Sequence, residues 1–201
     1  MARRAKAVET DNTPGPEATK ASTVSAASTA DAKSDRKSRV SQTDVPNYSL
    51  DDALRVAKAI GDNYAFKDAT PLEVATALNM TLASSGFRML CGSSIAYGLT
   101  EGGYNAGHIS VQPLAKRILE PTEEGDDLTA RRQAILQPRI LSEFLKKYDQ
   151  AKLPREDIAL NVLAQMGVPR DSTKQAYDLI IKSATSVGFI QKIKDNTYVN
   201  L

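Results

Sequence analysis

The sequence predicts a mainly α-helical (α+β) protein with short β-strands, arranged as two similar helical modules. Apolar residues recur at helical spacing along most of the chain, and two of these helical patterns end at a glycine that precedes a β-hairpin pattern. The two glycines are Gly98 and Gly188, and an acidic segment at 120–127 separates the two regions. We therefore expect a first module at 46–119 and a second module at 128–201.

The N-terminal segment, residues 1–45, differs in composition from the rest of the chain. It has no aromatic residue and is rich in Ala, Ser and Thr with scattered charges, so it cannot bury enough apolar surface to offset chain entropy. Its eight basic and six acidic residues account for the whole net charge of +2. We therefore expect a disordered, solvated tail. The six acidic residues argue against an organelle transit peptide.

Composition limits the class of protein. With 41% hydrophobic and 5% aromatic residues and no tryptophan, the 201 residues suit two small cores of Ala, Leu, Ile and Val. The apolar runs are far shorter than the roughly 20 residues that a membrane-spanning helix needs. We expect a cytoplasmic protein, associated with the nucleoid if it binds DNA. The single cysteine, Cys91, falls on the apolar side of a predicted helix, which predicts a buried structural thiol.

Capping signals open the first two predicted helices. Ser49 is a suitable N-cap, and the apolar residues that follow it keep helical spacing as far as Tyr64. The segment 70–73, Thr-Pro-Leu-Glu, is a capping box with proline at the first helical position. It predicts a second, short helix that continues through Leu78.

A third helix and a hairpin complete the predicted first module. The helix follows a turn near Thr81 and ends at Gly98, which is free to adopt the left-handed conformation of a C-terminal cap. Residues 109–111 then predict a strand, and residues 113–119 predict a closing helix. After this helix, the segment 120–127 has five acidic residues, no basic residue, a proline and a glycine, and we interpret it as a linker.

The second module repeats this order. A helix is predicted from Leu128 with a break at Pro138, because proline cannot donate the helical hydrogen bond. Another helix opens at Pro154 and a last one runs from Asp171 to the glycine at 188. Residues 189–199 alternate around a turn at Asp195-Asn196, which predicts a terminal hairpin.

The order of helix, glycine stop and hairpin resembles the C-terminal part of a winged-helix domain, in which a recognition helix precedes a β-hairpin wing. The run ISVQPLAKRIL at 109–119 is similar to the strand and terminal helix of many bacterial and archaeal winged-helix regulators. The body from Pro46 to Leu201 therefore resembles a tandem pair of winged-helix (helix-turn-helix) modules. This resemblance implies a binding protein.

In DNA-binding winged helices the third helix enters the major groove and the wing touches the neighbouring backbone. The second module has twelve basic and seven acidic residues, whereas the first has six of each. The resemblance therefore implies a DNA-binding transcriptional regulator or a nucleoid-associated protein. Its candidate DNA contacts are Ser85, Arg88, Arg170, Lys174, Lys192 and Lys194.

The alternative is a protein-interaction scaffold or accessory subunit without nucleic-acid binding, or a self-associating protein. The neutral first module and its wing without Lys or Arg favour this alternative, with Met89 and Tyr104 as contacts. We expect no enzyme, cofactor or metal site. His108 is the only histidine and has no second His or Cys nearby, and no nucleophile–base set or phosphate-cradling glycine loop is visible.

Overall fold

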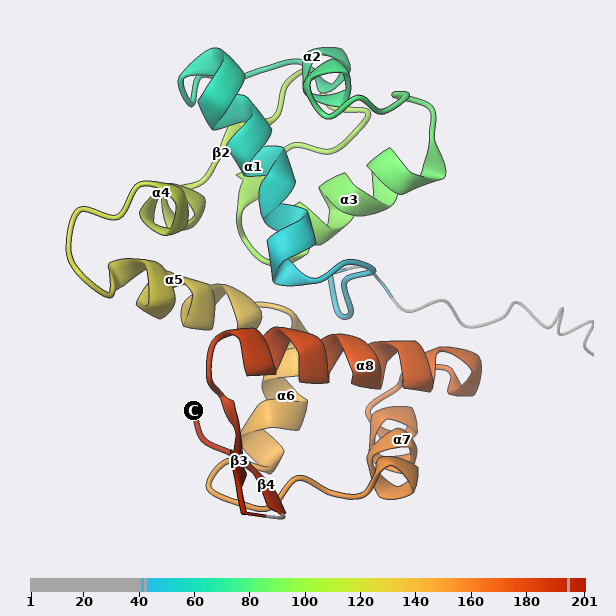
Figure 1. Ribbon diagram of the computed structural model, residues 1–201. Helices are drawn as coiled ribbons and strands as arrows, with labels where there is room; N and C mark the ends of the chain where they lie inside the picture. The colour runs from blue at the N-terminus through green and yellow to red at the C-terminus, as the bar shows by residue number, and fades with distance from the viewer. Residues whose placement is uncertain (1–40, 42, 195) are drawn as a thin grey trace, which may run out of the picture. The chain divides into compact units, whose positions relative to one another are not determined.

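Eight helices and two β-hairpins make up the regular secondary structure of the described residues (Figure 1). The computed structural model describes residues 41, 43–194 and 196–201. Most of the predicted tail, residues 1–45, lies outside the described residues. The predicted fold class, mainly α-helical with short antiparallel hairpins, is confirmed in that form. Within the described residues, no helix combines the length and the apolar character needed to cross a membrane.

The N-terminal half holds four helices and the first hairpin. In order these are α1 (Leu50–Tyr64), α2 (Pro71–Ala77), α3 (Ser85–Ala96), β1 (Thr100–Glu101), β2 (Ser110–Val111) and α4 (Pro113–Leu119). The predicted caps are confirmed. The Ser49 hydroxyl accepts a hydrogen bond from the Asp52 amide at the start of α1. Thr70 and Glu73 form the reciprocal capping box of α2. Gly98 has a φ of +69°, as the predicted stop after α3 requires.

The C-terminal half holds four further helices and the second hairpin. In order these are α5 (Asp126–Ile135), α6 (Arg139–Lys147), α7 (Glu156–Gln165), α8 (Arg170–Ser186), β3 (Ile190–Ile193) and β4 (Asn196–Val199). The helix expected from Leu128 begins earlier, because Asp126 and Asp127 occupy its first turn, where carboxylates suit the helix dipole. The predicted break at Pro138 is confirmed, since Pro138 precedes α6.

Each hairpin is extended by a single β-bridge to a nearby segment. This segment lies between α1 and α2 for the first hairpin, and between α6 and α7 for the second. In the N-terminal half, Ala69 forms an antiparallel bridge with Ile109. In the C-terminal half, Lys152 forms an antiparallel bridge with Tyr198. Both hairpins are therefore paired with the chain just before α2 and α7 respectively, although neither bridge is long enough to count as a strand.

Buried apolar side chains form one continuous cluster that includes residues of both halves. The described residues belong to one compact unit, and α5 packs along α4. Arg132 of α5 donates a hydrogen bond of 3.0 Å to the carbonyl oxygen of Val187, and its guanidinium lies over the Phe189 ring. This cation lies at the negative C-terminal end of α8, where it stabilises the helix.

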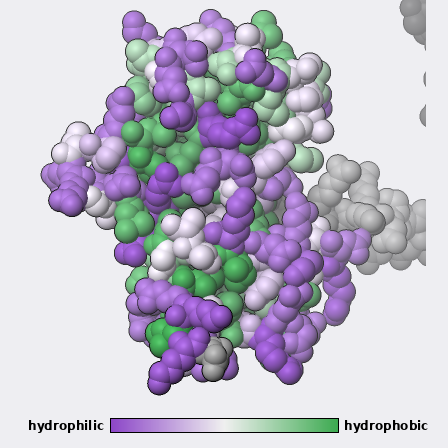
Figure 2. Space-filling model, viewed as in Figure 1, coloured by the Kyte–Doolittle hydropathy of each residue, from purple (hydrophilic) through white to green (hydrophobic). Residues whose placement is uncertain are grey.

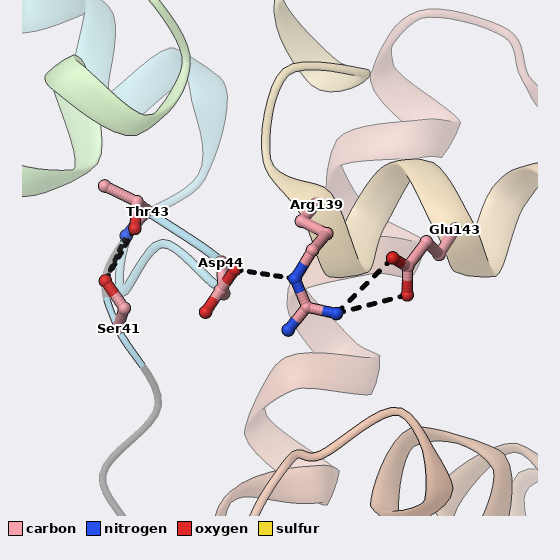
Figure 3. Close-up of polar contacts among 5 residues, drawn as sticks. All are labelled: Ser41, Thr43, Asp44, Arg139 and Glu143. Atoms are coloured by element: carbon pink, nitrogen blue, oxygen red, sulfur yellow. Dashed lines mark hydrogen bonds and ion pairs between the residues drawn. The ribbon is translucent and has the colours of Figure 1, made fainter.

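Ion pairs also join distant parts of the chain. The Arg139 Nε of α6 donates to the Asp44 carboxylate at 2.8 Å, and Arg139 also reaches Glu143 one turn along the helix (Figure 3). The Ile140 amide donates to the Asp44 carbonyl oxygen at 3.2 Å. The last residues of the segment that we expected to be tail are therefore held against α6.

Candidate nucleic-acid interface

The start of α8 carries two of the predicted DNA contacts in a charge-balanced setting. The Lys174 ammonium lies 2.7 Å from Glu156 and 3.1 Å from Asp178, and it lies over the Tyr177 ring. Hydrogen bonds to Glu156 and then to Asp178 raise the pKa of Lys174. The positive charge of Lys174 is thus already neutralised by two carboxylates. Arg170 is exposed in the first turn of α8.

The second hairpin carries the predicted contacts Lys192 and Lys194. Lys192 is on β3, where it pairs with Thr197 of β4. Lys194 is in the turn with a φ of +55°, and the pairing of Ile193 with Asn196 moves this turn one residue earlier than predicted. Both lysine side chains are exposed. The hairpin therefore presents two positive charges at its free end.

Three more lysines lie around this hairpin. The segment 149–153 runs beside β4, with the Leu153 amide donating to the Thr197 carbonyl oxygen at 2.8 Å, and this pairing places Lys152 at the sheet. Lys146 and Lys147 form the last turn of α6, which leads directly into the segment. These two lysines were not among the candidate DNA contacts in the sequence analysis, which therefore missed their place beside the hairpin.

We call these five residues the hairpin lysine cluster, and all of them are exposed. Within the described part of the chain, the ion pairs involve other basic residues and none of these five. Asp149 lies on the same segment and accepts a hydrogen bond from the Leu201 amide. Hydrophilic side chains border hydrophobic ones at this end of the molecule (Figure 2). The members of the cluster are Lys146, Lys147, Lys152, Lys192 and Lys194.

Two of the predicted contacts of the N-terminal half, Arg88 and Tyr104, meet at the first hairpin. The Arg88 guanidinium of α3 lies over the Tyr104 ring, 5.0 Å from its centroid. Met89, the next residue of α3, is 40% exposed, and Tyr104 is 38% exposed. Ser85 is exposed in the first turn of α3. The structure thus brings a predicted DNA contact and a predicted partner contact together.

Neither Cys91 nor His108, the two residues considered for chemistry, lies in a cluster typical of a catalytic or metal site within the described residues. Cys91 is buried, as predicted, and burial raises the pKa of its thiol to about 12. The exposed His108 lies with its Nε2 3.8 Å from Asp68. In the residues that the structure describes, no three histidine, cysteine or carboxylate side chains gather as a metal site would require.

A groove of about 210 Å³ lies between the start of α1 and α8. Its charged groups already have partners: Lys182 lies 3.6 Å from Asp52, and Asp178 pairs with Lys174. These side chains are exposed to solvent, so the groove offers neither a desolvated charge nor an unpaired one. It is a weaker ligand site than the hairpin lysine cluster.

Comparisons of the chain with protein-family models, with curated protein sequences and with solved structures give no match. The functional argument therefore depends on the chemistry of the two hairpins and of the helices beside them.

Proposed function

We propose that the protein is a DNA-binding winged-helix protein, a transcriptional regulator or nucleoid-associated factor, that holds DNA phosphates with the hairpin lysine cluster. The observation that carries this proposal is the gathering of five exposed lysines, without a carboxylate partner in the described residues, around β3 and β4. Lysines of this kind bind phosphates and release the counterions that surround DNA.

The order of elements supports the tandem winged-helix interpretation, with modules at 46–119 and 128–201. In the first half the order is α1, the bridging Ala69, α2, α3 and the hairpin β1–β2. In the second half it is α6, the bridging Lys152, α7, α8 and the hairpin β3–β4. A helix, an edge segment, two helices and a wing is the order that a winged-helix module would have.

The charges indicate which parts of the second module contact the phosphates. Arg170 and the cluster are available, whereas Lys174 already has two carboxylate neighbours. Five phosphate contacts would give a slope of about −4.5 when the logarithm of the binding constant is plotted against the logarithm of the salt concentration. We therefore expect moderate affinity that falls steeply with salt.

The test is a salt titration of binding to a random-sequence DNA duplex, with the full chain and a double variant, Lys192→Ala with Lys194→Ala. The variant should bind all sequences more weakly, and its salt slope should be shallower by about 2. A matched double variant, Lys58→Ala with Lys67→Ala, removes two exposed lysines from the first half and should keep the slope. An unchanged slope in the hairpin variant, or no binding at low salt, would overturn the proposal.

A second candidate function is a protein-interaction scaffold. The contact of Arg88 with Tyr104 favours it, because an arginine stacked on an aromatic ring beside the exposed Met89 is typical of protein interfaces. Replacing Tyr104 with alanine should then weaken capture of a partner while DNA binding is unchanged.

A further inference from the structure

The hairpin β3–β4 has two faces with different surroundings. Val199 is fully buried and pairs with Ile190, which packs against the hydrophobic core. Leu153 of the neighbouring segment packs against the same core. Because side chains alternate along a strand, these residues define the inner face of the small sheet. Gln191 and Tyr198, and then Ile193 and Asn196, must point to the outer face, whereas the exposed Lys192 shares the inner side with Ile190 near the hairpin tip.

The outer face combines an aromatic ring, amides, an apolar side chain and a positive charge. The register places Gln191 opposite Tyr198, and Ile193 opposite Asn196. Lys152 is also opposite Tyr198, from the other side. Residues directly opposite each other share a face, so one row across the sheet reads Lys152, Tyr198 and Gln191. Ile193 is 53% exposed next to this row.

We infer that this outer face binds unpaired nucleotides of single-stranded DNA. The inference rests on the proposed function and names the form of the nucleic acid. The partly exposed Tyr198 offers a ring on which a base can stack, while Lys152 lies beside it to hold the phosphate. The Asn196 amide and the Gln191 Oε1 can bond to base edges, while the Gln191 Nε2 donates to the carbonyl oxygen of Gly188. A base can reach such a platform only when it is unpaired.

The charge distribution favours a strand over a duplex at this face. Reading a duplex with α8 would bring its phosphates toward Glu156 and Asp178, which already neutralise Lys174. The lysines without carboxylate partners instead surround the sheet, at the end of α6 and at the hairpin tip. A flexible strand can follow these lysines around the sheet while it places a base on Tyr198, whereas a duplex keeps its bases stacked inside.

The experiment uses the full chain and a labelled mixed-sequence strand of about 20 nucleotides, compared with its duplex. The chain has no tryptophan, so Gln191→Trp places a single tryptophan, which can be excited separately from the tyrosines, opposite Tyr198 on an exposed position. The strand should bind this variant several-fold more tightly than it binds the unchanged protein and should quench its emission. The duplex should leave the emission unchanged.

A loss-of-function series complements this variant. Tyr198→Leu should weaken binding of the strand by about tenfold and binding of the duplex by less than twofold, whereas Tyr198→Phe should keep strand binding, because phenylalanine retains the stacking ring. Tyr64→Leu, at a partly exposed tyrosine of α1 that belongs to neither hairpin, is the matched control and should change neither affinity. Thermal unfolding of each variant checks that the fold is kept.

The outcomes separate this inference from the proposed function. If the strand binds but does not change the Gln191→Trp emission, or if Tyr198→Leu weakens strand and duplex binding equally, the outer face is not the platform. If the duplex binds with the expected salt slope and the strand binds no more tightly, the inference fails and the proposed function stands. If neither binds at low salt, both fail.

Discussion

The hairpins β1–β2 and β3–β4 each follow a helix that ends at a glycine with positive φ, Gly98 at +69° and Gly188 at +75°. The first hairpin joins two residue pairs and the second joins four. The chain between β1 and β2 has no Lys or Arg, whereas the second hairpin carries Lys192 and Lys194. The same order of elements thus builds two surfaces with different chemistry, so the order predicts where a hairpin forms and its side chains decide what it binds.

The two hairpins also differ in how they are held. In the first, Gly102 has a φ of +87°, and a Cβ atom at this position would lie 2.2 Å from the carbonyl oxygen of His108. The strands approach so closely there that only glycine fits. The second hairpin depends instead on its longer ladder and on the neighbouring segment 149–153.

The largest expected effect comes from breaking the close approach in the first hairpin. Gly102→Ala should lower the free energy of unfolding by about 2 to 4 kcal/mol, because it adds both a backbone clash and an unfavourable φ. Gly107→Ala is the control: no atom lies within 4 Å of its Cβ position, and the change should stay within about 0.5 kcal/mol. Urea unfolding measures both. Equal unfolding free energies for the two variants would show that the close approach at Gly102 does not require a glycine.

A smaller effect tests whether the two helix ends are equivalent. Gly98→Val and Gly188→Val should each destabilise the protein by about 1 to 3 kcal/mol, since a β-branched residue resists positive φ. The nearest atoms to the two Cβ positions both lie at 3.6 Å, an ordinary contact distance, so a Cβ atom itself meets no clash and the positive φ supplies its strain. Urea unfolding of both variants should give similar values. A loss at one glycine alone would mean that α3 and α8 end differently.

Local signals made much of the fold predictable. The capping box of Thr70 and Glu73 and the stop at Gly98 depend on residues that are close in sequence, and the structure confirms them. The start of α5 was misjudged by two residues, because Asp126 and Asp127 were assigned to the acidic linker. Their carboxylates suit the first turn of the helix, and Asp126 is also held by Arg117, a partner from another helix. A residue's helical state can depend on such contacts, which sequence spacing does not reveal.

The candidate site was less predictable for the same reason. The sequence places Lys174 near the start of a helix, where it was predicted to contact DNA. In the structure its charge is instead paired with the Glu156 carboxylate of α7. Lys152 joins the second hairpin only through its bridge to Tyr198, 46 residues further along the chain. Composition revealed that the C-terminal half is basic, whereas tertiary pairing decides which of its charges are available.

The smallest expected effect concerns the junction that joins α4 to α5 between the two halves. The Nε of Arg117 lies 3.1 Å from the Asp126 carboxylate, and hydrogen bonds from Arg117 lower the pKa of Asp126. The unfolded chain then takes up a proton at higher pH than the folded chain. The ion pair therefore stabilises the fold above the ordinary pKa of aspartate, and this contribution is lost as the pH falls through the lowered value.

Asp126→Asn tests this contribution, because asparagine cannot ionise. The variant should be less stable than the unchanged protein at pH 7, and the difference in unfolding free energy should shrink as the pH is lowered below the ordinary range of aspartate. Solvent screens a partly exposed pair, so the difference should be smaller than that of either glycine series. Urea unfolding at both pH values measures it, and Asp62→Asn, at the exposed partner of Lys58, is the control. A difference that stays constant with pH would mean that Asp126 contributes through helix capping or packing and not through its charge. The junction would then be held by fit, as the first hairpin is at Gly102, and not by an ion pair.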